Sequence, residues 1–165
     1  IYMAGEARKS PMNDRETAID RLSYDFDCEA EIIAKLMDEG NTYLELKNCL
    51  LHAYAAKVSL SEIIELRKLY GWAMINYKLG LSAQDLWEAN IQHQADRMEK
   101  FMQLDRKIVI EWMHKGYGVH QIKRASFIAR HIDKPLAEIL ALKTRQIKWP
   151  EVAESLGLSP ESCRE

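Results

Sequence analysis

The residues of this chain that come closest to a metal-binding motif are Glu111 and His114. They have the spacing of the Glu-x-x-His pair in a di-iron helical bundle. Such a bundle needs two of these pairs and two further glutamates, all pointing into one core. The stretch of the chain most similar to this one has Lys35 and Asp38 at the corresponding positions. We therefore expect no metal ion and no other cofactor.

Four carboxylates at alternate positions form an acidic cluster: Asp25, Asp27, Glu29 and Glu31. Residues two apart point to different sides of a helix, so only Asp27 and Glu31 share a face. Two exposed carboxylates on a helix are ordinary. The sequence has no glycine-rich phosphate loop, no G-x-S-x-G elbow and no Cys/His nucleophile pattern. We therefore expect that the protein is not an enzyme.

Basic residues gather in one segment. Residues 115–148 contain eight lysines and arginines against Asp133 and Glu138, a net charge of +6, so the rest of the chain carries −8. A basic face of this kind is compatible with an acidic protein partner, with the acidic face of a second copy, or with nucleic acid, and also with plain solvation. The candidate binding residues are Gln121, Lys123, Arg124, Arg130, His131, Lys143, Arg145 and Lys148.

Residues 153–159, A-E-S-L-G-L-S, have the pattern A-x-x-x-G-[LI]-S that is typical of the middle of a DNA-reading helix-turn-helix. In that motif the helix after the turn lies near phosphates and base edges. The segments that follow Ser82 and Ser159 both carry carboxylates, which a polyanion repels. We therefore interpret the pattern as a packing device, in which glycine supplies a left-handed turn.

The aromatic residues divide into core and surface candidates. Trp72 and Trp149 hold equivalent places in an internal repeat, and Trp112 lies on the expected inner face of a long helix, so we expect all three in the core. Trp87 and Tyr117 are expected to be exposed contact residues.

The elements that must position these residues are helices. No proline occurs between Pro11 and Pro135, the seven glycines fall where elements would end, and apolar residues recur at three and four. Capping boxes are expected at Thr42, Ser59 and Ser82, each followed three residues later by an acidic residue. No alternating run indicates a strand pair, so the fold class is all-α.

Residues 32–82 and 108–159 align with each other at a shift of 76, and of 77 after one inserted residue. The sequence therefore predicts a tandem duplication of a four-helix, helix-turn-helix-like unit, with a long central helix between the copies. We expect a flexible leader (1–12), a first repeat (13–82) and a second segment with the bridging helix and second repeat (83–165), in one compact domain. The expected helices are about 13–38, 42–56, 60–69 and 72–79, then 82–115, 118–132, 135–145 and 149–156.

The second copy carries the pattern G-Y-x4-I, E-I-L-x-L and W-x2-V-A-x3-G-L-S over residues 116–159. This pattern resembles that of uncharacterised bacterial all-helical proteins with degenerate helix-turn-helix-like repeats. The first copy departs from it, with Asn41 in place of the tyrosine and Asn76 in place of the alanine. The resemblance implies a helical-repeat fold and, because its motifs are core and turn residues, says little about function.

With 47% apolar and 29% charged residues, the composition is that of a globular protein, and no apolar run reaches the length of a membrane span. Cys28 and Cys49 are expected as buried free thiols, which favours a reducing, cytoplasmic location. An exported form with a removed signal peptide stays open, since residue 1 is Ile. We expect a non-catalytic interaction or scaffold protein; the alternative is a nucleic-acid-binding regulator.

Overall fold

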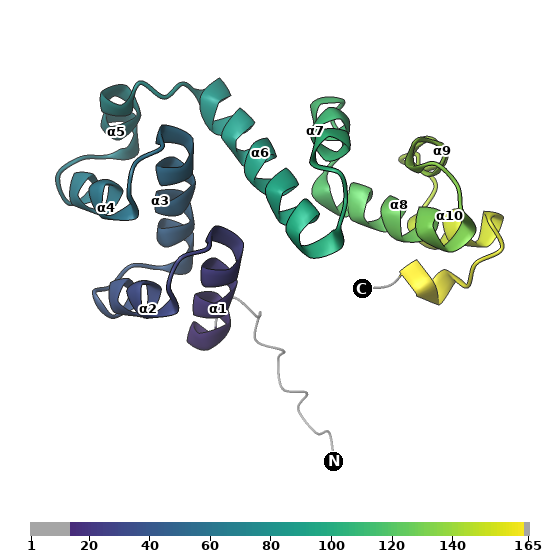
Figure 1. Ribbon diagram of the computed structural model, residues 1–165, viewed down its shortest axis with the longest axis horizontal. Coiled ribbons are helices and arrows are strands. Elements are labelled where there is room, and N and C mark those ends of the chain that lie inside the picture. The colour runs from purple at the N-terminus through teal and green to yellow at the C-terminus, as the bar shows by residue number, and fades with distance from the viewer. Residues whose placement is uncertain (1–13, 164–165) are drawn as a thin grey trace, which may run out of the picture. The chain divides into compact units, whose positions relative to one another are not determined.

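The computed structural model describes residues 14–163, and the regular secondary structure of that range is ten α-helices and one 3-10 helix, with no strand (Figure 1). The all-α class is confirmed. The chain divides into two compact units, Ile1–His93 and Gln94–Glu165, called unit 1 and unit 2 below. The leader predicted over residues 1–12 lies outside the described residues. Of the helices described, none combines the length and apolar character that a bilayer span requires.

Unit 1 is organised around one helix, α3, which contacts α1, α2 and α4. In Figure 1 this helix stands between the α1–α2 pair and the α4–α5 pair. Its inward side chains Leu46 and Cys49 are fully buried with Leu22, Ile33 and Ile63. The helices of the unit are α1 (Arg15–Phe26), α2 (Ala30–Asp38), α3 (Tyr43–Ala56), α4 (Leu60–Leu69), α5 (Trp72–Leu79) and the first part of α6 (Ala83–Met102).

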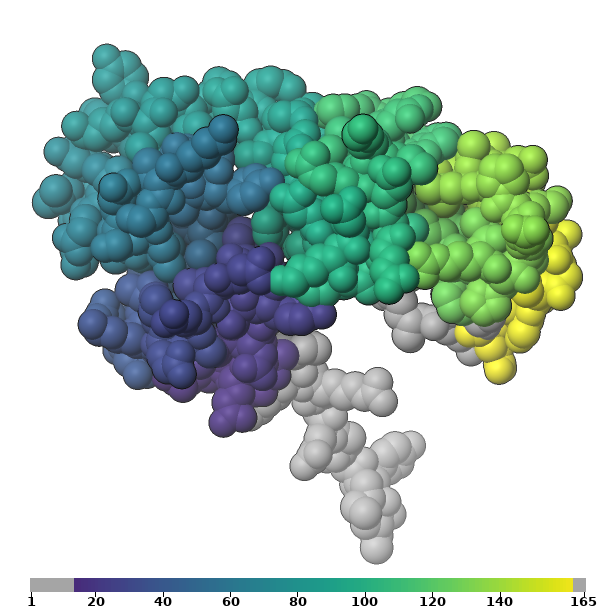
Figure 2. Space-filling model, in the orientation of Figure 1, coloured from purple at the N-terminus to yellow at the C-terminus, as the bar shows by residue number. Residues whose placement is uncertain are grey.

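Unit 2 contains the rest of α6 and four further α-helices. Its core has two parts, one around Ile128, Ile139 and Trp149 and one around Met98 and Val109. The closing 3-10 helix, Pro160–Cys163, packs on α10, and Figure 2 shows this yellow segment against the yellow-green helix. The helices are α7 (Arg106–His114), α8 (Val119–Ile132), α9 (Leu136–Leu142) and α10 (Trp149–Ser155).

The long helices predicted over 13–38 and 82–115 are wrong, because each is broken once. The first breaks at Asp27 and the second at Gln103, both in the left-handed region with φ of 51° and 54°. Asp105, which interrupts the apolar stripe, is the N-cap of α7 and accepts a hydrogen bond from the backbone N–H of Lys107 at 2.8 Å. The new helix direction buries Val109 in the Met98 core, whereas a continuous helix would extend past it.

The break also changes which residues of α7 face inward. Val109 is 1% exposed, whereas Ile108, which the predicted continuous stripe places inside, is 45% exposed. Because a turn between two helices resets the helical phase, a stripe read across the break assigns the wrong face.

The N-caps predicted at Thr42 and Ser59 are confirmed as single caps, and at Ser82 the bonds of a capping box run in both directions. Thr42 and Ser59 accept hydrogen bonds from the backbone N–H groups of Glu45 and Glu62, each at 3.2 Å. The Ser82 hydroxyl accepts from the backbone N–H of Asp85 at 3.1 Å, while the Asp85 carboxylate accepts from the backbone N–H and hydroxyl of Ser82. These bonds satisfy amide donors that a helix start leaves without intrahelical partners.

Candidate interaction surface

Helix α8 carries five of the eight candidate binding residues. Its inner side buries Ile122, Ala125, Ser126 and Ile128. Gln121 is used locally, because its side-chain oxygen accepts from the backbone N–H of Gly118 at 2.9 Å and so caps the helix. The remaining four candidates lie on the sides and outer face of the helix: Lys123, Arg124, Arg130 and His131.

Two of these cations are engaged with α6. The Arg130 guanidinium donates a hydrogen bond to the carbonyl oxygen of Met102, at the last residue of α6. Lys123 lines a small cavity of about 90 Å³ with Met98 and Phe101 of the same helix. A cation at a helix C-terminus is favourable because unpaired carbonyl groups give that end a partial negative charge. Arg130 is therefore a stabilising contact of unit 2 as well as an exposed charge.

The other two candidates on α8 differ in exposure. Arg124 is half-buried, and His131 is exposed with its ring 4.2 Å from that of Phe127. The Nδ1 atom of His131 lies 2.8 Å from the Phe127 carbonyl oxygen and donates to it. This hydrogen bond leaves only Nε2 of the imidazole for an external partner.

The other three candidates lie in the segment between α9 and α10, residues 143–148, which we call the basic linker. The Lys143 ammonium group donates a hydrogen bond to the carbonyl oxygen of the next residue, Thr144, at 2.6 Å, while Arg145 and Lys148 are exposed. Two apolar side chains accompany them: Leu142 at the end of α9 is 40% exposed, and Ile147 is 38% exposed. The linker therefore presents apolar side chains between cations.

Of the aromatic residues predicted in the core, Trp149 is confirmed there, while Trp72 and Trp112 are half-buried. Trp149 is buried, and Trp72 and Trp112 pack against the cores of their units. Trp87 is 47% exposed, as expected. Tyr117 is instead half-buried, with its ring in edge contact with that of Trp112 at 5.2 Å, so packing accounts for it.

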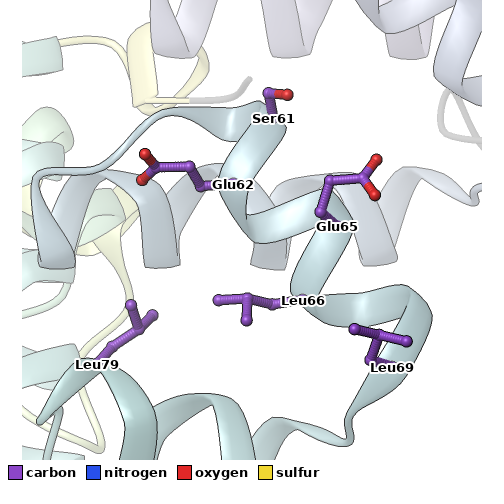
Figure 3. Close-up of a pocket in the computed structure, with 6 residues that line it drawn as sticks. All are labelled: Ser61, Glu62, Glu65, Leu66, Leu69 and Leu79. Carbon is purple, nitrogen blue, oxygen red and sulfur yellow. The ribbon is translucent and has the colours of Figure 1, made fainter.

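An apolar groove on α4 and α5 was not found from the sequence. It is an open groove of about 460 Å³ lined by Leu66, Leu69 and Leu79, with Ser61, Glu62 and Glu65 on its α4 side (Figure 3). Leu69 is 74% exposed, although it lies on a helix whose opposite side is core. The signal that could have revealed it is the Leu66–Leu69 pair at spacing i, i+3, outside the stripe formed by Ile63 and Ile64.

The end of α4 is held by a polar cluster. Arg67 Nε lies 2.5 Å from Glu45 Oε1, its Nη1 donates to the Tyr70 carbonyl oxygen at 3.1 Å, and its guanidinium lies 4.3 Å from the centre of the Trp72 ring. His52 stacks on the same indole at 4.2 Å. The hydrogen bond with Glu45 raises the pKa of Arg67 above its usual value. Together these contacts join α3, α4 and α5.

Cys28 and Cys49 are free thiols, half-buried and buried, close to what the sequence indicates. Burial raises the pKa of the Cys49 thiol to about 12, and the nearby Glu45 carboxylate contributes in the same direction. A thiol with this pKa is almost wholly protonated at neutral pH and is a poor nucleophile.

Within residues 14–163 no three His, Cys, Asp or Glu side chains gather closely enough to hold a metal ion. Comparison with known proteins returns no match: no protein-family model, no curated protein and no solved structure is similar to this chain. Two surface features of the described residues are candidates for binding a partner: the basic linker and the apolar groove.

Proposed function

We propose that this protein is a non-catalytic interaction module whose unit 2 binds an acidic protein surface. The observation that carries the proposal is the basic linker, where Arg145 and Lys148 are exposed beside the apolar Leu142 and Ile147. Cations around apolar contact residues suit a partner with carboxylates around an apolar patch, because opposite potentials guide encounter while apolar burial provides affinity.

We also propose that the chain arose by tandem duplication, with a five-helix rather than a four-helix repeat. Helices α2 and α7 both have nine residues, and α3 and α8 both have fourteen. Every described residue with positive φ has a counterpart 76 positions away, or 77 beyond the inserted residue. The pairs are Asp27 and Gln103, Gly40 and Gly116, Lys57 and Asp133, and Gly80 and Gly157.

A nucleic-acid-binding regulator is the second candidate, favoured by the helix-turn-helix-like turn at Gly80–Ser82. The first turn of α6 weighs against it, because Asp85 lies there and its pKa is lowered by hydrogen bonds from Ser82. A carboxylate held ionised at the start of a recognition helix repels phosphate.

The test is fluorescence anisotropy with two labelled probes, a polyglutamate peptide and a random-sequence DNA duplex, each at two salt concentrations. The wild type is compared with R145E/K148E, which spares Arg130 and its contact with α6. The matched control is K35E/K47E, which makes the same change in net charge at two exposed lysines of unit 1.

We expect polyglutamate binding that R145E/K148E weakens at least about tenfold and K35E/K47E changes less than about twofold. Steeply salt-dependent DNA binding that is lost in R145E/K148E would favour the nucleic-acid alternative instead. No binding of either probe, or equal losses in both variants, would overturn the proposed basic surface.

A further inference from the structure

The groove on α4 and α5 has the composition of a docking site. Leu66 and Leu69 of α4 and Leu79 of α5 form its apolar part, and Figure 3 shows these three side chains around one opening. Leu69 exposes 74% of its surface, far more than a leucine that packs within its own unit. An exposed apolar group of this kind gains free energy when a partner removes it from water.

The rim of the groove is acidic. Glu62 and Glu65 extend from α4 beside the leucines (Figure 3). Glu65 also pairs with Lys68, whose Nζ lies 2.6 Å from its Oε1, but both side chains are more than half exposed. An exposed ion pair of this kind contributes little to stability, so a cation of a ligand can replace Lys68 beside Glu65 at a small cost in free energy. The groove thus favours a ligand with apolar anchors and adjacent positive charge.

The chain itself contains a segment with this chemistry. The basic linker offers Ile147 as a partly exposed apolar anchor and Arg145 and Lys148 as exposed cations. Leu142, the last residue of α9, adds a second apolar anchor beside it. Both surfaces combine apolar and charged groups, and the charges are opposite. The same complementarity holds at larger scale, because residues 115–148 carry +6 and the rest of the chain carries −8.

We propose that the groove of one molecule binds the basic linker of a second copy of this chain. This inference rests on the proposed function, since it uses the same basic linker and names its partner. The two surfaces differ, so the contact is heterologous and leaves one groove and one linker free after each addition. Further association of this type builds open chains or closed rings, or closes a dimer in which each groove holds the linker of the other copy.

The experiment measures mass against concentration by sedimentation equilibrium, from about 1 µM to about 1 mM, which covers weak and moderate affinities. The groove variant is E62K/E65K, the linker variant is R145E/K148E, and a third variant carries all four substitutions. K35E/K47E is again the net-charge control for the linker variant, because both variants make the net charge more negative by the same amount. L69S tests the apolar part, and because Leu69 is largely exposed its loss should leave the fold unchanged.

We expect the wild-type mass to rise with concentration, and the groove and linker variants each to weaken association at least about tenfold. Mixing these two variants should restore association. The unchanged linker of the groove variant then meets the unchanged groove of the linker variant, and the two charge-reversed surfaces are also opposite in charge. The variant with all four substitutions should have an association constant within about threefold of the wild-type value, since its groove and its linker are again opposite in charge. L69S should weaken association about fivefold or more through lost apolar contact.

A wild type that stays monomeric over the whole range would overturn the inference. Association that is equally strong in the groove variant, the linker variant and L69S would also overturn it. The same holds if the two charge variants lose association and neither mixing them nor combining all four substitutions restores it. Binding of polyglutamate separates this failure from failure of the proposed function. A monomeric wild type that still binds the peptide through Arg145 and Lys148 keeps the function and loses only the self-association.

Discussion

The end of α4 in unit 1 and the end of α9 in unit 2 make opposite use of a basic residue. In unit 1, Arg67 joins Glu45, the Tyr70 carbonyl and the Trp72 ring, and α4 runs to Leu69 with only two residues before α5. In unit 2, under the proposed duplication, Lys143 stands in place of Arg67 and turns to its neighbour, Thr144. Helix α9 ends at Leu142, and six residues separate it from α10.

The difference between arginine and lysine at these two helix ends accounts for the difference in their packing. A guanidinium has several donors in a planar fork and stacks on an indole, whereas an ammonium group is a compact point charge, so lysine does not replace arginine in such a cluster. Glu45 is matched by Gln121, which caps α8 instead. With no ion pair to hold the last turn, residues 143–148 form the basic linker. Under the proposed duplication, a packing contact in unit 1 corresponds to a candidate binding segment in unit 2.

The largest expected effect concerns the tryptophans beside these two segments. We expect W149A to destabilise unit 2 by about 4 kcal/mol, because Trp149 is buried and its removal leaves a cavity. W72A should cost unit 1 about 2 kcal/mol, since Trp72 is only half-buried. Native-state hydrogen exchange measures the free energy of unfolding of each unit separately. An equal loss in both units would contradict the difference in burial.

Cys49, which lies under the Arg67 cluster and corresponds to Ala125 in unit 2, provides the second test. In a C28S/C163S variant, alkylation of Cys49 by iodoacetamide at pH 8 should be at least about 100-fold slower in the folded chain than in urea, because a raised pKa leaves little thiolate. Similar rates in both states would contradict the burial of this thiol.

The same pKa determines the sign of a pH effect. The thiol keeps its proton in the folded chain up to about pH 12, whereas in the unfolded chain it loses it near 9. The unfolded state therefore binds fewer protons between these values, and the stability of unit 1 should fall as the pH rises through this window. C49A should reduce this alkaline loss in a urea titration at several pH values.

A smaller effect is expected when unit 1 is made to resemble unit 2. R67K/E45Q should destabilise the end of α4 by about 1 kcal/mol, since it removes a half-buried ion pair and a cation–π contact. The backbone N–H of Tyr70, which donates to the Leu66 carbonyl oxygen at 2.8 Å, should then exchange faster with solvent. Unchanged exchange at Tyr70 would show that the cluster does not hold this turn.

The smallest effect is the reverse exchange. Q121E/K143R places the charged pair in unit 2 and should add about 0.5 kcal/mol of local stability, with slower exchange at Thr144 and Arg145. If those amides gain no protection, the extra residue that unit 2 has between Leu142 and Trp149, rather than the missing ion pair, keeps the linker open.

How much of the fold is predictable depends on the kind of helix end. The ends at Gly40, Gly80, Gly116 and Gly157 were predicted, and each of these glycines has positive φ. The breaks at Asp27 and Gln103 were missed, because neither residue type requires a left-handed turn. A non-glycine residue adopts it only when the packing of the two flanking helices offsets a cost of roughly 1 kcal/mol.

The candidate surface was predicted in composition but not in arrangement. The sequence showed a basic segment, but only the structure separates Arg130, which bonds to the end of α6, from Arg145 and Lys148, which are exposed. The groove was missed altogether, since its leucines come from two helices whose pairing is a tertiary feature.

By itself, the sequence determined the helical class, the caps at Thr42, Ser59 and Ser82, and the apolar faces within each unbroken helix. These features depend on neighbours within one or two turns, where spacing along the chain is also spacing in space. Tertiary structure alone decided where the long helices break and which charges are used internally. Those outcomes depend on residues far apart in the chain, such as Arg130 and Met102, whose proximity exists only after the helices have packed.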